Sequence, residues 1–224
     1  DVHGCMEELV ELLTMLGYEL ADWELDDEAL IAANHPEGRR LLFVGDLCDR
    51  GPMNVPVLRL VMSSVQAGSA LMVLGNHDDR LRRYLKGNQV TLNHGLGDTA
   101  DELNAYSDAF CQRVLEFLDA QNHYMVLDQG QLCIVHAGIQ PRMIGLKSDK
   151  IRSYCLYGPR DGYDDQGFPI RYDWPQDHDG KLAIVYGHTP NRPIRWRNNT
   201  LNLDGGCVFG GGLYACRWPE RDII

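Results

Sequence analysis

Apolar residues in the first third of the chain follow two different spacings. Leucines recur at helical spacing after Gly4 and end before Gly17, which predicts a helix there (Leu9, Leu12, Leu13 and Leu16). Residues 41–44 and 70–74 are short, continuous apolar runs, and each is directly followed by a glycine. With a helix expected at 55–66 between them, they predict a buried strand, a helix and a second buried strand. This alternation is typical of βαβ units with a largely parallel sheet.

The middle of the chain favours helices instead. Residues 98–104 and 108–121 have helical patterns, so we expect a helical insertion over about residues 95–122. The apolar runs at 125–128 and 132–135 flank Gln129-Gly130-Gln131, which predicts a hairpin. Loops rich in Gly, Asp and Pro are expected from 158 to 180. Short strands are expected at 183–186, 200–203 and 213–217.

Polar residues follow four of these apolar runs at the point where each run ends. They are Asp46, Asn76, His136 and His188. In open α/β sheets, ligands bind at the carboxyl ends of the strands. Core packing does not explain this regularity, so we expect these side chains to share one site.

Neighbouring residues add ligands and donors to this site. Asp1 and His3 are two positions apart, so in an extended segment both side chains would point to one side and could hold a dication; a solvent-facing Asp beside a hydrogen-bonded His is the alternative. Asp46 could bridge two metals through its carboxylate. Arg50 offers a planar fork of donors that suits a phosphate group, and Asp49 could orient an imidazole. A turn with a surface Asp–Arg pair is the alternative for this segment.

Asn76 could supply a neutral oxygen to a hard metal, or cap the helix expected at 79–86. His77, hydrogen-bonded to Asp49, is better placed to act as an acid than as a ligand. His136 and His188, taken singly, suit buried and satisfied histidines. Together with the other motifs they suggest a mixed nitrogen and oxygen site for Mn²⁺, Fe, Ni²⁺ or Zn²⁺.

Two other groups of residues stay ambiguous. A basic cluster at Arg80, Arg82, Arg83 and Lys86 could be a solvated helix face or could hold a polyanion, and the same holds for Arg192, Arg195 and Arg197. Cys5, Cys48 and Cys207 lie near motifs without the spacing of thiolate ligands, so we interpret them as small packing residues.

Composition narrows the class of protein. With 224 residues, 44% of them hydrophobic and 24% charged, the chain suits one globular domain over residues 1–224. Its apolar runs are too short to span a membrane. Seven cysteines without a C-x-x-C pair suggest reduced thiols in a cytoplasmic protein. The net charge of −11 argues against non-specific binding along a nucleic-acid backbone, but not against an enzyme that grips a single phosphate.

Five ordered motifs carry a resemblance that spans essentially the whole chain: Asp1-Val2-His3-Gly4, Gly45-Asp46-Leu47-Cys48-Asp49-Arg50-Gly51, Gly75-Asn76-His77-Asp78, His136-Ala137-Gly138 and Gly187-His188-Thr189. They resemble the calcineurin-like metallophosphoesterases, in the phosphoprotein phosphatase branch. Stretches such as Gly167-Phe168-Pro169-Ile170-Arg171-Tyr172 and Gly206-Cys207-Val208-Phe209-Gly210 resemble the phosphatase domain of bacterial polynucleotide kinase-phosphatase. Tyr84-Leu85-Lys86-Gly87-Asn88 is shared with the PrpE-type diadenosine tetraphosphate hydrolases.

The resemblance implies an α/β fold, a β-sandwich of mixed sheets flanked by helices, and a role for each motif residue. Asp1, His3 and Asp46 would bind one metal, and Asp46, Asn76, His136 and His188 the other, with Mn²⁺ as the first expectation. Arg50 and Asn76 would contact phosphate, and His77, held by Asp49, would be the general acid. Asp204 would support the site from behind the ligands. Gly205 departs from the family, which usually has Thr there.

The implied activity is a metal-dependent phosphatase or phosphodiesterase in which a metal-bridging hydroxide attacks phosphorus directly. We expect a substrate at a nucleic-acid end, either a 2′- or 3′-phosphate or a 2′,3′-cyclic phosphate, as in RNA repair. A dinucleoside polyphosphate hydrolase is the alternative, a protein Ser/Thr phosphatase the next, and an inactive binding module on the same fold the last.

The first motif begins at residue 1, although a buried strand normally precedes it in this family. We therefore expect the chain to be a fragment of a longer protein that lacks its first strand. In the full-length protein it could be fused to kinase and ligase-like domains.

Overall fold

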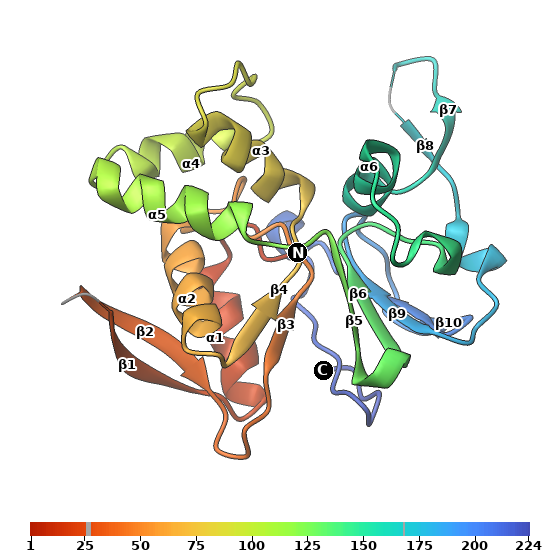
Figure 1. Ribbon diagram of the computed structural model, residues 1–224, viewed down its shortest axis with the longest axis horizontal. Coiled ribbons are helices and arrows are strands. Elements are labelled where there is room, and N and C mark those ends of the chain that lie inside the picture. The colour runs from red at the N-terminus through yellow and green to blue at the C-terminus, as the bar shows by residue number, and fades with distance from the viewer. Residues whose placement is uncertain (26–27, 168) are drawn as a thin grey trace.

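The computed structural model describes residues 1–25, 28–167 and 169–224. Its elements form two halves, and the N-terminus lies between them (Figure 1). Phe168, which contributes to one of the family-like stretches, lies outside the described residues. Among the described residues no helix is both long and apolar enough to cross a membrane.

The first half is built on a βαβ unit. Its elements are α1 (Met6–Met15), β1 (Glu19–Leu25), β2 (Glu28–Asn34), β3 (Leu41–Phe43), α2 (Asn54–Gln66) and β4 (Ala70–Met72). Strands β3 and β4 pair in parallel, with Leu41 opposite Ala70, which confirms the predicted strand–helix–strand order. The predicted first helix is confirmed as well, because α1 buries Leu9, Leu12 and Leu13.

The helical insertion is also confirmed. It contains α4 (Leu96–Leu103) and α5 (Asp108–Asp119), which follow α3 (Asn76–Leu85) and cover one end of this half (Figure 1). Helix α5 starts at Ser107, whose side chain accepts a hydrogen bond from the Phe110 N–H group. Leu81, Leu96 and Leu118 from the three helices are buried in one core with α2.

The second half is a five-stranded mixed sheet. Its strands are β5 (Tyr124–Leu127), β6 (Leu132–Val135), β9 (Ala183–Tyr186), β10 (Trp196–Arg197) and β11 (Thr200–Asn202), in the order β10-β11-β9-β6-β5. The pairs β6–β9 and β9–β11 are parallel, whereas the predicted β5–β6 hairpin is antiparallel. Helix α6 (Asp149–Tyr157) lies on the outer side of this sheet (Figure 1).

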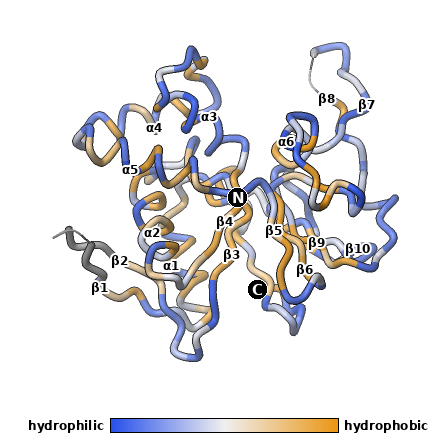
Figure 2. The backbone as a smooth tube through the Cα atoms, viewed as in Figure 1, coloured by the Kyte–Doolittle hydropathy of each residue, from blue (hydrophilic) through white to orange (hydrophobic). Residues whose placement is uncertain are grey.

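Alternation along β6 explains how the layers stack. Ile134 packs in one apolar cluster with Val44 and Val73 at the ends of β3 and β4. Cys133 and Val135 point to the other face and pack with residues of α6 and the loop after it. In Figure 2 the tube is coloured as hydrophobic along much of β3, β4 and β6. The result is the predicted α/β sandwich of mixed sheets flanked by helices.

Three predictions about elements need correction. Residues 213–217 form no strand, because their pairing is confined to an isolated bridge between Cys216 and Ile223 and a few backbone hydrogen bonds nearby. The loop expected from 158 to 180 contains a hairpin of β7 (Arg160–Tyr163) and β8 (Pro169–Arg171), followed by the 3₁₀ turn η3 (Trp174–Asp177). The side chains of β3, expected to be buried, are partly exposed.

The remaining short elements are the 3₁₀ turns η1 (Asp128–Gly130), η2 (Pro141–Met143) and η4 (Cys207–Phe209). The cysteines near the motifs, Cys5, Cys48 and Cys207, are buried as expected of packing residues. All seven cysteines are free thiols.

Candidate metal centre and active site

The loops after β3 and β4 approach each other closely, and this contact positions the first site residues. A Cβ atom at Gly45 would lie 2.5 Å from the backbone nitrogen of Gly75, so neither loop has room for a side chain there. The buried Asp78 carboxylate joins the loops, since it accepts N–H groups from Asp46 (2.8 Å), Leu47 (3.0 Å) and Gly75 (2.9 Å). Sequence reasoning missed this role of Asp78, although an acidic residue in the first turn of a helix is a capping signal.

Several site residues adopt backbone conformations that non-glycine residues rarely use. The φ angles of His3 (47°), Asp46 (52°), Asp49 (72°), Arg50 (73°) and His188 (78°) are all positive. Such conformations cost about 1–3 kcal/mol each and persist when the surrounding structure enforces them, and they cluster at functional sites. Their concentration in the motifs favours a functional role for these residues.

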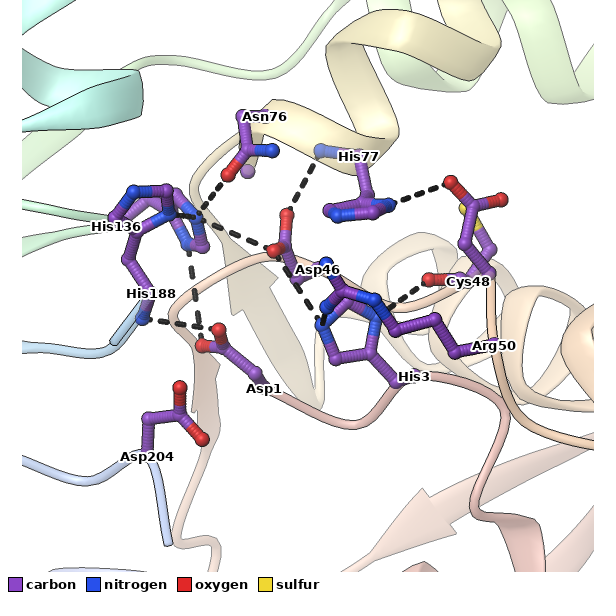
Figure 3. A network of polar contacts seen from close by, with 12 residues as sticks. Asp1, His3, Asp46, Cys48, Arg50, Asn76, His77, His136, His188 and Asp204 are labelled. Carbon is purple, nitrogen blue, oxygen red and sulfur yellow. Dashed lines mark hydrogen bonds and ion pairs between the residues drawn. The ribbon is translucent and has the colours of Figure 1, made fainter. Parts of the chain in front are cut away.

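Asp46 lies at the centre of the cluster (Figure 3). Its Oδ1 accepts the N–H group of His77 at 2.9 Å. Its Oδ2 lies 3.6 Å from Nε2 of His3 and 3.4 Å from Nε2 of His136. A single carboxylate oxygen therefore faces imidazoles from both halves of the molecule, as a bridging ligand would.

The tautomers of these two imidazoles suit metal binding. Nδ1 of His3 donates to the carbonyl of Cys48 at 2.8 Å, and Nδ1 of His136 donates to the carbonyl of Val44 at 2.9 Å. Each Nε2 then carries a lone pair that points toward Asp46. Burial lowers the pKa of His3 to about 4, so its imidazole is neutral at pH 7.

A second group of potential ligand atoms surrounds Nε2 of His136. Nε2 of His136 lies 2.9 Å from Oδ1 of Asn76 and 3.1 Å from Nδ1 of His188. Because Nδ1 of His136 donates to Val44, its Nε2 and the Asn76 oxygen are both acceptors and cannot bond to each other. Burial lowers the pKa of His188 to about 2, and its Nε2 has no hydrogen-bond partner among the described residues. Two acceptors this close without a proton between them fit a dication better than they fit a folded core.

Two sets of potential ligands, each within 4.8 Å, share Asp46: one with His3 and His77, the other with His136 and His188. In the set with His3, Nη1 of Arg50 lies 2.7 Å from Nε2 of His3. The positively charged guanidinium group thus lies where a metal ion would be bound. The residues present therefore fit two divalent metal ions.

Asp1 is placed differently from its prediction. His3 lies in a turn with a positive φ, so the segment is not extended. Oδ2 of Asp1 accepts the backbone N–H group of His188 at 2.9 Å. Its Oδ1 is buried without a hydrogen-bond partner among the described residues and faces the cluster (Figure 3). Asp1 is thus available as a ligand, but the reasoning from an extended strand was wrong.

The predicted contact between His77 and Asp49 is present. Nδ1 of His77 lies 2.6 Å from Oδ2 of Asp49, and both residues are buried. The other oxygen of Asp49 accepts the hydroxyl group of Thr99 at 2.6 Å. Nδ1 is taken, so Nε2 of His77 is the atom left to exchange a proton with a substrate. Thr99 comes from the helical insertion, and sequence reasoning missed it.

Asp204 lines a cavity of about 260 Å³ together with Asp1 and His3. Its Oδ1 accepts the N–H group of Gly206 at 2.9 Å, which fixes the turn that follows. The departure at Gly205 has a local reason, because a Cβ atom there would lie 2.3 Å from Cε2 of Tyr214. The Tyr214 ring therefore leaves no room for a side chain at position 205.

A larger cavity, of about 550 Å³, also adjoins the cluster and contains Asn76 and His77. Arg80, Arg83 and Arg171 contribute positive charge to its lining. We call this cavity the basic groove. The basic cluster therefore divides: Arg80 and Arg83 face the groove, whereas Arg82 and Lys86 pair with Asp119 at 2.8 and 2.6 Å.

Sequence reasoning missed Arg171, which is the last residue of β8 and lines both cavities. Its place in a family-like stretch was an available signal. Arg192 and Arg197 serve the local structure instead, because Arg192 donates to the carbonyl of Gly205 and Arg197 pairs with Asp173.

Comparison with known proteins identifies the class. The model of the calcineurin-like phosphoesterase family matches residues 1–221, and the chain belongs to this family. It is a metal-dependent phosphoesterase, as the resemblance implied.

Individual relatives narrow the comparison. The chain is 42% identical to the bis(5′-nucleosyl)-tetraphosphatase PrpE [asymmetrical] of Anoxybacillus flavithermus, over 100% of the chain and 90% of the relative. It is 39% identical to the protein of the same name from Bacillus subtilis, over 100% and 91%. A crystal structure of a putative diadenosine tetraphosphatase has a TM-score of 0.66 at 22% identity, covers 100% of this chain and 89% of that one, and shows the same fold.

These relatives correct one expectation from the sequence. Their names support the alternative, a dinucleoside polyphosphate hydrolase, over an RNA-end phosphatase. They give no support to a relationship with polynucleotide kinase-phosphatase or to fused kinase and ligase-like domains.

Proposed function

We propose that this enzyme hydrolyses dinucleoside tetraphosphates, such as diadenosine tetraphosphate, asymmetrically into a nucleoside triphosphate and a nucleoside monophosphate. The observation that carries the proposal is the basic groove. Besides Arg50 it contains three further arginines, and it extends from Asn76 and His77, so it offers positive charge for several phosphates beyond the one at the metal site. The names of the relatives agree with this substrate class.

The two ligand sets would hold two dications, with Mn²⁺ as the first candidate. To one metal we assign Asp1, His3 and Asp46, and to the other Asp46, Asn76, His136 and His188. His77 is kept as the acid, although it also lies within reach of His3 and Asp46. When bound, the metals supply positive charge that stabilises the transferring phosphoryl group, and they acidify a water molecule. The shared oxygen of Asp46, between His3 and His136, supports this division of ligands.

The other residues act on the substrate. Arg50 and Asn76 bind oxygens of the phosphoryl group that is attacked. His77 donates a proton from Nε2 to the departing oxygen, while Asp49 holds the ring through Nδ1 at 2.6 Å. Asp204 shapes the turn behind Asp1 and His3. Arg80, Arg83 and Arg171 bind phosphates that do not react.

A side-by-side assay tests the substrate class. Purified enzyme with Mn²⁺ is given diadenosine tetraphosphate, an RNA 2′,3′-cyclic phosphate and a phosphopeptide. We expect kcat/KM for the tetraphosphate to exceed the other two by at least about tenfold, because neither competitor fills the basic groove with phosphates. A preference for the RNA end would contradict the proposal, and so would a preference for the phosphopeptide.

A further inference from the structure

An exposed aromatic side chain stands beside the metal cluster. Phe209 is 66% exposed, more than any other large apolar side chain whose burial is described. It belongs to η4, a turn in which the Phe209 N–H group donates to the carbonyl of Gly206 and the Gly210 N–H group donates to the carbonyl of Cys207. Cys207, at the start of the same turn, is buried. The ring therefore stands on a well-fixed base while its own surface faces solvent.

The ring lies next to groups that bind phosphate in the proposed function. It lines the 260 Å³ cavity that also contains Asp1, His3 and Asp204. The guanidinium carbon of Arg50 is 5.4 Å from the centre of the Phe209 ring, and Nη1 of Arg50 reaches His3. A molecule with a phosphate on Arg50 could therefore place a flat group on Phe209.

The two cavities both adjoin the metal cluster and share Arg50, Arg171 and His188. They differ in character. The basic groove contains the acid His77, so the leaving group must depart into it. The smaller cavity has Phe209 in its wall and lacks His77. A substituent that stays on the attacked phosphorus would occupy this second cavity.

We infer that Phe209 is the stacking platform for the nucleobase that remains with the attacked phosphorus, and that the triphosphate leaves through the basic groove. This assignment rests on the proposed function. Aromatic rings bind bases of any identity through stacking, so the subsite accepts purine nucleotides without strict choice among them. It also fixes which of the four phosphorus atoms reacts.

The reaction then balances as follows. The oxygen of one water molecule forms a bond to the phosphorus that carries the nucleoside. The bond from that phosphorus to its bridging oxygen breaks, and this oxygen takes a proton from Nε2 of His77. The products are a nucleoside monophosphate, held on Phe209, and a nucleoside triphosphate, held by Arg80, Arg83 and Arg171. The proton of the attacking water goes to solvent and His77 is reprotonated from solvent.

Phe209→Ala tests the platform. We expect kcat/KM for diadenosine tetraphosphate to fall about tenfold more than kcat/KM for p-nitrophenyl phosphate, which has no base to stack. Phe209→Tyr keeps a ring and should restore the ratio of the two values. Tyr163→Ala is the matched control, because Tyr163 is also an exposed ring (57%) with an arginine carbon 5.1 Å from its centre, but it lies on β7 away from the cluster. An unchanged ratio in Phe209→Ala would overturn the inference.

Hydrolysis in ¹⁸O-labelled water tests the direction of cleavage. The inference predicts label in AMP and none in ATP, measured by mass spectrometry. Label in ATP would mean attack on an inner phosphorus and would overturn it. Wild-type enzyme that does not hydrolyse the tetraphosphate at all would refute the proposed function instead, so the two failures are distinguishable.

Discussion

Thr99→Val would remove one hydroxyl group from the support of the Asp49–His77 pair while it nearly keeps the shape of the side chain. Thr99 is fully buried. Its hydroxyl donates to Oδ1 of Asp49 at 2.6 Å and accepts the backbone N–H group of Asp49 at 3.2 Å. Valine replaces neither bond, so a buried carboxylate oxygen and a buried N–H group would both lose a partner.

Each buried polar group left without a partner costs about 1–3 kcal/mol. Two such groups lower the free energy of unfolding by about 3 kcal/mol, which for a domain of this size corresponds to about 6–12 °C in Tm. Asp49 would also hold His77 less firmly. We therefore expect turnover of diadenosine tetraphosphate to fall about tenfold, because a misplaced acid loses part of its contribution to the rate.

Urea unfolding and steady-state kinetics measure the two effects. Thr99→Ser keeps the hydroxyl and should recover most of both. Thr14→Val is a matched control, since the Thr14 hydroxyl bonds only the carbonyl of Val10 on the exposed face of α1, and we expect a change below about 0.5 kcal/mol. A loss of less than about 1 kcal/mol in Thr99→Val would refute the reasoning.

Three further perturbations test other parts of the site. His77→Ala should keep both metals, measured by elemental analysis, but turnover of substrates with poor leaving groups should fall about 10²–10⁴-fold. Loss of metal would instead show that His77 is a ligand, which its proximity to His3 and Asp46 also allows. Chelation should abolish activity and lower Tm, because metals that bind only the folded site stabilise it, and added Mn²⁺ should restore both. Activity that survives complete metal removal would contradict the two-metal assignment. Gly205→Thr should lower the free energy of unfolding by about 2 kcal/mol or more, because its Cβ atom would lie 2.3 Å from Tyr214. Gly97→Ala, whose Cβ atom would meet nothing closer than 3.4 Å, should change stability little. Equal effects would mean that Tyr214 moves aside freely.

Local patterns in the sequence predicted the elements that local interactions determine. The leucines of α1 and the apolar runs of β3, β4, β6 and β9 identified helices and strands within one or two residues. The rule that ligands bind at the carboxyl ends of strands predicted from sequence that Asp46, Asn76, His136 and His188 lie together. Figure 3 shows these side chains in one cluster.

The features that sequence patterns missed depend on partners far along the chain. Thr99 hydrogen-bonds Asp49, which lies 50 positions earlier in the chain. Asp78 accepts hydrogen bonds from Asp46 and Leu47, at separations of 32 and 31 positions, so no short window of sequence contains either contact. Residues 213–217 contain a short apolar run that suggests a strand, but they pair only through an isolated bridge and a few backbone hydrogen bonds. The segment at His3 is a turn rather than an extended strand because the backbone there adopts a positive φ, which composition and spacing do not reveal.

Product analysis of diadenosine tetraphosphate hydrolysis tests the central claim most directly. Purified enzyme with Mn²⁺ is incubated with the substrate, and the nucleotides are separated by chromatography during the first few per cent of the reaction. In our account the basic groove, which contains the acid His77, holds the leaving triphosphate, and the second cavity holds a single nucleoside. This arrangement predicts ATP and AMP in equal amounts. Two molecules of ADP would show symmetrical cleavage, and they would contradict the account.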